Sequence, residues 1–250
     1  MSLPNTIRGV LKALDEIIAE CEATNSRLGY FAYVYRRTTA EIAKEIKLGH
    51  FEDNDRMEKF DVIFANLYLK AYYDYRVNQQ VSQSWEFSFQ NSKKELTIIQ
   101  HILFGMNAHI NLDLGIAAAE TMKSKDVREI ENDFNKVNDI LFQIINELQE
   151  RLSRVSPLMF LLDWIGKNTD EKIIDFSMRK ARSQAWNSAN LIWSLGEDNQ
   201  KAVDQVDELV LKLSQLIGNP KNFLTRVFLK LMGFFEEKEV RTVIVKLSSD

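Results

Sequence analysis

Apolar residues recur at spacings of three and four along almost the whole chain, and this pattern most narrows what the chain can fold into. Such spacing places side chains on one face of an α-helix, whereas a half-buried strand alternates at every second residue. One clear stripe contains Ile7, Val10, Leu11, Leu14, Ile17, Ile18 and Cys21, and another contains Val127, Ile130, Phe134, Val137, Leu141, Ile144, Ile145, Leu148 and Leu152. The sequence therefore predicts an all-α protein.

Turn and cap signals divide this pattern into about seven to nine helices. The longer predicted helices begin at residue 7 and then cover about 28–48, 56–82, 94–123, 127–156, 169–195 and 200–217. Gly49 and Gly196 follow two of them, as glycine often does at a helix end. A short buried helix is predicted in 156–168, next to Pro157. The segment 82–96 is predicted to be irregular, because serine and asparagine cluster there and the helical period lapses.

The tail beyond residue 220 is predicted to form two shorter helices divided near Gly233. Residues 241–247 would also suit a strand, because they are rich in β-branched side chains. The chain has no clear repeat and no flexible linker, so we predict a single-domain multi-helix bundle over 1–250. A signature region would cover about 55–195, with 200–250 as a helical extension packed on it.

Composition and charge exclude several classes of protein. Hydrophobic residues make up 45% and charged residues 27%, with 9 Gly and 3 Pro, which is typical of a folded helical chain. The net charge of -4 and pI of about 5.6 argue against nucleic-acid binding. The single cysteine cannot form an internal disulfide. No apolar run reaches the roughly 18 residues of a transmembrane segment, and charged residues interrupt the first helix where a signal peptide would be apolar. We therefore expect a cytoplasmic protein, and no feature indicates its oligomeric state.

The predicted helix 94–123 carries polar residues in an otherwise apolar segment, IQHILFGMNAHINLDLGIA. At about 100° per residue, His101, His109 and Asp113 share one face, with Gly105 and Ala108 between the histidines. The far side of the helix carries Gln100, Asn107 and Asn111. A helix that is apolar nearly all round is expected to be central and buried, so its polar groups need partners.

Neighbouring helices offer such partners. Asp61 shares a stripe with Tyr68 and Tyr72 in the predicted helix 56–82. The helix 169–195 aligns Arg179, Arg182 and Trp186 with small alanines. A buried arginine needs a carboxylate, and the available candidates are Asp61, Asp113 and Asp163.

Three interpretations of this polar network remain open. In the first, His101, His109, Asp113 and Asp61 bind a divalent transition metal, as in a metal-dependent hydrolase or oxidase. In the second, a metal-free pocket binds a small molecule, and the candidate catalytic residues are His109 and Asp113. His109 acts as acid or base, Asp113 or Asp61 orients it, and Tyr68, Tyr72 or an arginine holds an anionic substrate. In that case we expect a cavity bordered by Tyr68, Tyr72, Trp186 and His109. In the third, the network is structural, as in an interaction protein without a catalytic site.

The segment HILFGMNAHINLDL resembles the signature of an uncharacterised bacterial family, a domain of unknown function with the pattern H-x3-G-x-N-A-H-I-N-x-D-L. Nine positions match over fourteen residues, and KFDVIFANLY and RKARSQAWNSANLIW extend the resemblance over about 55–195. The resemblance implies a helical fold and marks His101, His109 and Asp113 as the residues to test. It implies no activity.

The segment LTRVFLKLMGFF combines phenylalanines with Arg226 and Lys230. This composition would suit a membrane surface or an apolar partner. Core packing is favoured, because the adjacent Glu236 and Glu237 would repel anionic lipid.

Overall fold

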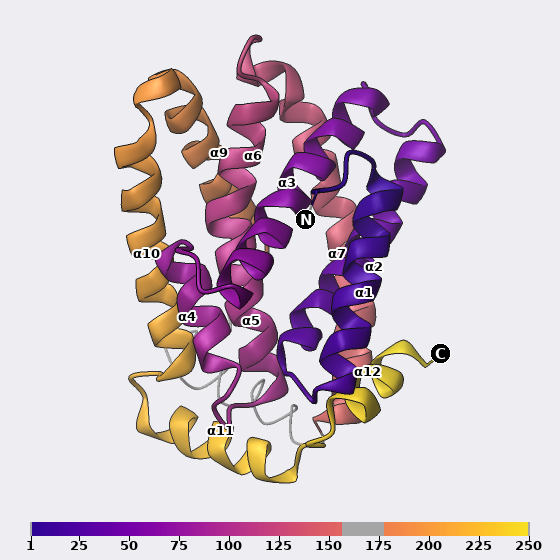
Figure 1. Ribbon diagram of the computed structural model, residues 1–250, viewed down its shortest axis with the longest axis vertical. Coiled ribbons are helices and arrows are strands. Elements are labelled where there is room, and N and C mark those ends of the chain that lie inside the picture. Colours follow the sequence, from indigo (N-terminus) through magenta and orange to yellow (C-terminus); the bar gives the residue numbers. More distant parts are fainter. Residues whose placement is uncertain (1, 157–177, 250) are drawn as a thin grey trace.

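The computed structural model describes residues 2–156 and 178–249, and this part of the chain is all-α, as predicted (Figure 1). It contains eleven α-helices and no strand, which is more helices than the seven to nine expected. The helices are α1 Ile7–Ala23, α2 Leu28–Lys47, α3 Asn54–Arg76, α4 Gln83–Asn91, α5 Ile98–Ala108, α6 Leu114–Thr121, α7 Glu131–Val155, α9 Met178–Leu195, α10 Gln200–Gly218, α11 Phe223–Phe235 and α12 Val240–Ser248. The short helix expected in 156–168 lies almost wholly outside the described residues.

Helix ends follow the chemistry read from the sequence. Thr6 caps α1 by accepting a hydrogen bond from the backbone N–H of Gly9, and Asp53 caps α3 in the same way from Arg56. Gly49 and Gly196 follow α2 and α9 with positive φ angles of 75° and 57°. Glycine adopts this left-handed backbone at little cost, so both helices end where predicted.

The prediction of an irregular segment over 82–96 is wrong for its first half, which forms α4. Ser82 caps this helix, and the Asp207 carboxylate on α10 accepts hydrogen bonds from the backbone N–H groups of Gln83 and Ser84 at 2.7 and 3.0 Å. An acceptor more than 120 residues away thus satisfies donors at the start of α4. Trp85 and Phe89 on this helix are buried. Local periodicity could not show either contact.

The predicted central helix is present, but it is not uniform. It begins at Ile98 after a capping box formed by Thr97 and Gln100, and continues as α5, a π-helical turn over His109–Asp113, and α6. The helix Ile98–Thr121 is long and apolar enough to cross a membrane by length and composition. However, 78% of its apolar 18-residue stretch is buried inside the described structure. It is the core helix of the bundle.

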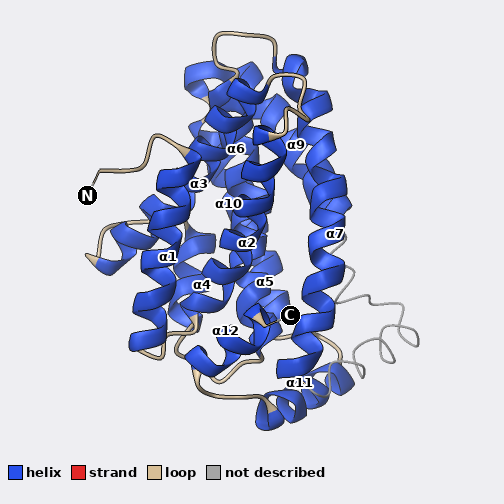
Figure 2. Cartoon of the chain, turned by 90° about the vertical axis from the view of Figure 1, so that its right-hand side faces the viewer, coloured by secondary structure: helices blue, strands red, loops and turns tan. Residues whose placement is uncertain are grey.

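Most helices run along the long axis of the molecule, with α5 and α6 inside the bundle (Figures 1 and 2). One core cluster joins side chains from α2, α3, α5, α6, α7, α9 and α12. The C-terminal segment 241–247 lies in α12, so the strand alternative is wrong there. Four side chains of α12 belong to this core: Val240, Val243, Ile244 and Leu247.

Helix α11 differs from the prediction of core packing. It lies across one end of the molecule rather than along the bundle (Figure 1). Only Leu229 and Met232 of its large apolar side chains are buried, in a small cluster with Ile99. Its phenylalanines at 223, 234 and 235 are exposed, so core packing is wrong for this face.

Candidate functional site

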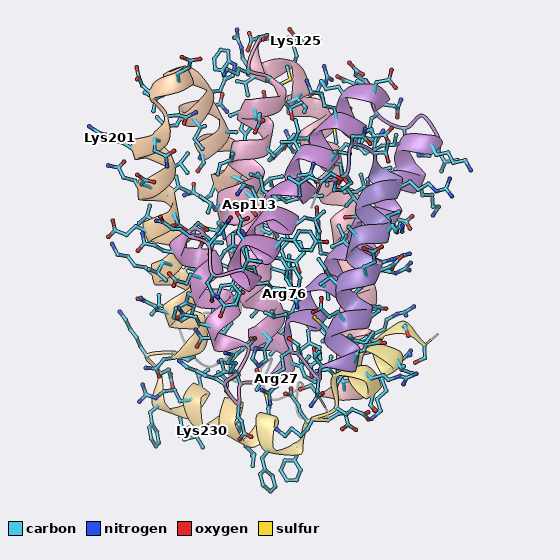
Figure 3. All side chains as sticks on the ribbon, in the orientation of Figure 1. Arg27, Arg76, Asp113, Lys125, Lys201 and Lys230 are labelled. Carbon is cyan, nitrogen blue, oxygen red and sulfur yellow. The ribbon has the colours of Figure 1, made fainter. Side chains whose placement is uncertain are left out.

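The π-helical turn brings His109 and Asp113 together at the centre of the bundle. His109 Nδ1 lies 2.9 Å from Asp113 Oδ2, and the Trp85 indole N–H donates a hydrogen bond to the same oxygen at 2.9 Å. The His109 and Asp113 side chains are almost completely buried, and Asp113 lies away from both ends of the molecule (Figure 3). A π-turn widens the helix locally and is often found at functional sites. The sequence predicted that these two residues share a face of the helix, and in the structure their side chains are in direct contact.

Aromatic rings fix the orientation of the His109 imidazole. It stacks on the Phe64 ring with centroids 3.7 Å apart and an interplanar angle of 6°, and the Tyr35 ring meets it edge-on at 4.3 Å. The second ring nitrogen, Nε2, is buried without a hydrogen-bond partner. The ring therefore cannot turn freely to exchange its two nitrogens.

Burial sets the protonation of this pair. It lowers the pKa of His109 well below its ordinary value and raises the pKa of Asp113 well above its ordinary value. Both shifts favour the uncharged forms at neutral pH. When the Asp113 carboxyl is protonated, its hydroxyl donates to His109 Nδ1, and the ring proton of the neutral imidazole is then on Nε2. In this form His109 presents an N–H donor that no described acceptor satisfies.

An internal cavity of about 60 Å³ lies beside this pair. Its walls come from α2, α3, the central helix, α7 and α9, and are mostly apolar. The apolar residues include Val34, Ile42, Met57, Phe60, Ile110 and Leu114, and the polar side chains include Tyr35, Asp61, His109 and Arg182. All four of these polar residues carry a buried atom without a hydrogen-bond partner. This concentration of unsatisfied groups marks the cavity as the candidate site.

Asp61 is one of these groups. It is 3% exposed, and its Oδ2 has no hydrogen-bond partner. Burial, with a smaller contribution from the charge of Glu58, raises the pKa of Asp61 to about 7. A large fraction of this carboxyl is therefore protonated at neutral pH, and it can donate a hydrogen bond into the cavity.

Arg182 is the second of the unsatisfied polar residues in the cavity. Its guanidinium donates to the backbone carbonyl of Phe134 at 2.5 Å and lies over the Phe134 ring at 4.4 Å from the centroid, while Nε has no partner. No carboxylate in the described part of the chain forms an ion pair with it, so of the three candidate partners Asp61 and Asp113 are excluded. Asp163 lies outside the described residues. Burial lowers the pKa of Arg182 to about 9, so the group keeps its charge at neutral pH.

His101 occupies a different environment from His109. Its ring lies 6.2 Å from that of Tyr30 and 6.5 Å from that of Phe104. Burial, and secondarily the charge of Arg27, lowers its pKa to about 4. Among the described residues, no three histidine, cysteine or acidic side chains are gathered as metal ligands would be. The metal set predicted from the sequence remains a prediction without geometric support.

The other predicted residues lie around the cavity rather than on its wall. Tyr68 packs its ring against Trp85 at 5.1 Å, and Tyr72 contacts the Cys21 sulfur at 3.9 Å. Trp186 packs on the Phe134 ring that carries Arg182. The side chain of Arg179 lies outside the described part.

Asn107 and Asn111 face another neighbour, as their place on the helix predicted. Asn107 donates to the Val210 carbonyl and to the Ser214 hydroxyl of α10, both at 2.8 Å, and Asn111 donates to the Asn107 carbonyl oxygen at 2.9 Å. These bonds join the central helix to α10. Their role in the described structure is to fix the register of the two helices.

Sequence reasoning missed three residues of the site: Tyr35, Phe64 and Trp85. Tyr35 belongs to a run of aromatic residues, YFAYVYRR, which predicts either helix contacts or a pocket wall and does not single out one ring. Trp85 falls in the segment predicted to be irregular. A tryptophan among serines was the available signal, since a buried indole N–H requires an acceptor.

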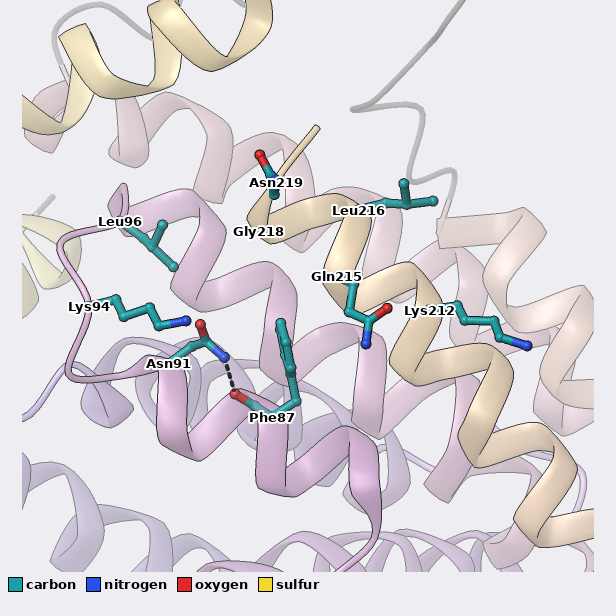
Figure 4. Close-up of a pocket in the computed structure, with 9 residues that line it drawn as sticks. All are labelled: Phe87, Asn91, Lys94, Leu96, Lys212, Gln215, Leu216, Gly218 and Asn219. Atoms are coloured by element: carbon teal, nitrogen blue, oxygen red, sulfur yellow. Dashed lines mark hydrogen bonds between the residues drawn. The ribbon is translucent and has the colours of Figure 1, made fainter. Parts of the chain in front are cut away.

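A larger hollow of about 610 Å³ opens at the surface between α4 and α10 (Figure 4). Asn91 lines it and already donates to the Phe87 carbonyl at 2.7 Å. Lys212, also on its wall, pairs with Glu208 at 2.8 Å. The hollow thus lacks the unsatisfied groups that distinguish the internal cavity.

Comparison with known proteins assigns most of the chain to a family. Residues 7–220 match a family described as a family of unknown function, DUF5995. No curated protein and no solved structure matches the chain. The match covers the central helix and every residue of the cavity.

Proposed function

The chain belongs to the family of unknown function DUF5995, and we propose that its internal cavity binds a small carboxylate anion between Arg182, Asp61 and His109. One observation carries the proposal. Hydrogen-bond donors line one cavity, and no described acceptor satisfies them: the Arg182 Nε–H, the Tyr35 hydroxyl, the protonated Asp61 carboxyl and the Nε2–H of the His109 tautomer that faces a protonated Asp113.

Charge favours an anionic ligand. A buried guanidinium without a counter-ion is costly, because several kcal/mol of hydration are lost when an ion leaves water. Among the described residues, Arg182 receives only a backbone carbonyl and an aromatic face in return. A carboxylate would supply the missing charge and accept charge-assisted hydrogen bonds, for which the planar guanidinium is well shaped.

The cavity also limits the size of the ligand. A cavity of roughly 150 Å³ accepts benzene, whereas this one measures about 60 Å³. It therefore suits a molecule of a few heavy atoms. Side chains such as Ile110 and Leu114 would contact a short alkyl group, so acetate and propionate are the natural first probes.

We expect Arg182→Met to weaken binding of acetate and propionate by at least about thirtyfold, because truncating one partner of a buried charge pair costs roughly 2 kcal/mol or more. The affinity is measured by NMR titration of the folded protein at pH 6. Methionine fills similar space without charge, so the fold should survive, and circular dichroism checks this.

Arg76→Met is the matched control. Arg76 is a half-exposed arginine at the end of α3, it is paired with Glu20, and it does not line the cavity. This variant should bind like the wild type. Equal affinity in Arg182→Met and the wild type, or no binding of either acid by the wild type, would overturn the proposal.

A further inference from the structure

Helix α11 presents a continuous apolar face to solvent. Six large side chains on it are between 43% and 77% exposed: Phe223, Leu224, Val227, Leu231, Phe234 and Phe235. At about 100° per residue they occupy an arc of about 120° on one side of the helix. Leu229 and Met232 on the opposite side hold the helix against the bundle. Contiguous apolar surface of this kind indicates an interaction site.

Cations flank this face. On the same wheel, Arg226 and Lys230 lie next to the apolar arc, within about 60° of its edge. They line a groove of about 430 Å³ together with Lys238 and one acid, Glu95. None of the three cations forms an ion pair with a described carboxylate. Arg226 donates instead to the backbone carbonyls of Pro220 and Lys221, and Lys238 donates to that of Gly233.

The glutamates that follow α11 do not oppose an anionic partner as the sequence suggested. Glu236 is 5% exposed, and its carboxylate accepts hydrogen bonds from the Ile98 backbone N–H at 2.8 Å and the Ser156 hydroxyl at 2.6 Å. Glu237 caps the backbone of Lys238 and pairs with Lys246 at 3.7 Å. Both acids are thus committed to the bundle and to α12, and the apolar face keeps its cationic border.

From these observations we propose that α11 docks the protein on an anionic lipid bilayer. The six apolar side chains enter the interface, and Arg226, Lys230 and Lys238 contact lipid phosphates. An amphipathic helix with aromatic and aliphatic residues on one face and cations at its border has this chemistry. The helix lies across one end of the molecule, so its outer side can meet a flat surface (Figure 2). The proposal is independent of the cavity and its ligand.

Vesicle flotation tests it, with phosphatidylcholine vesicles prepared with and without phosphatidylserine. The wild type should float with the anionic vesicles and less with the neutral ones, and added salt should weaken binding. The double variant Phe234→Ser and Phe235→Ser should bind at least about tenfold less, because two exposed phenylalanines no longer enter the lipid. Lys230→Gln should bind about fivefold less.

Two controls match these changes. Leu48→Ser with Val77→Ser removes exposed apolar side chains outside α11, and Lys201→Gln removes a cation far from α11 (Figure 3). Both should float like the wild type. Failure of the folded wild type to float with anionic vesicles, or equal losses in the controls, would overturn the proposal. The proposal would also be overturned if the wild type did not bind vesicles and instead formed a dimer that the phenylalanine double variant dissociates.

Discussion

Gly105→Ala should destabilise the protein by at least about 3 kcal/mol, through overpacking of a site that cannot give way. A Cβ atom on Gly105 would lie 2.2 Å from Cγ of Phe31 and within 2.7 Å of two further ring atoms. The Phe31 ring cannot withdraw easily, because it packs against the rings of Tyr68 and Trp85. In a chain of this length the melting temperature should fall by roughly 10 °C, as calorimetry would show.

Gly233→Ala is the matched control, since it is also a helical glycine. An added Cβ there would lie 3.7 Å from Cγ2 of Thr97, which is an ordinary van der Waals contact. Alanine should leave stability unchanged or raise it by up to about 1 kcal/mol, from helix propensity alone. If Gly105→Ala were as stable as Gly233→Ala, the close approach of α5 and α2 would be wrong.

Asp61→Asn should stabilise the protein at alkaline pH. The folded protein holds the pKa of Asp61 near 7, against an ordinary value of 3.8. A raised pKa means that the stability of the acid form is lost as pH rises from about 4 through about 7. Asparagine cannot ionise, so its advantage over aspartate should be near zero at about pH 4 and reach roughly 4 kcal/mol well above pH 7.

Urea unfolding of both proteins at several pH values measures this difference. Asp55→Asn, an exposed change on the same helix, is the matched control and should not be more stable than the wild type. A constant difference between Asp61→Asn and the wild type from pH 4 to pH 8 would mean that Asp61 is solvated in the folded state. A buried Asp61 lowers the free energy of unfolding when it ionises. Such a loss of stability is expected at a residue that serves ligand binding.

The sequence was sufficient for the parts of the site that depend on one helix. The interval of four residues between His109 and Asp113 predicted a shared face, and the structure joins them at 2.9 Å. The apolar character of the central helix predicted that both would be buried. The alanine-rich face of the helix ending at Leu195 correctly marked Arg182 as a buried cation.

What the sequence could not supply depends on contacts between distant segments. Helix α4 is capped by Asp207, so its existence and the position of Trp85 follow from tertiary structure. Arg182 faces a backbone carbonyl and an aromatic ring instead of a carboxylate, because the helix wheel gives direction but not the neighbour met there. For the same reason the sequence could not show that Tyr35 lines the cavity, whereas Tyr68, Tyr72 and Trp186 lie behind its wall.

Calorimetric titration of the wild type with acetate at pH 6 and at pH 8.5 tests the carboxylate site most directly. Acetate beside an ionised Asp61 would be repelled, so binding requires the protonated carboxyl. The Kd should rise about tenfold per pH unit above the Asp61 pKa of about 7, with one proton taken up for each acetate bound. No binding heat at pH 6, or the same Kd at both pH values, would contradict a carboxylate site built from Arg182, His109 and protonated Asp61.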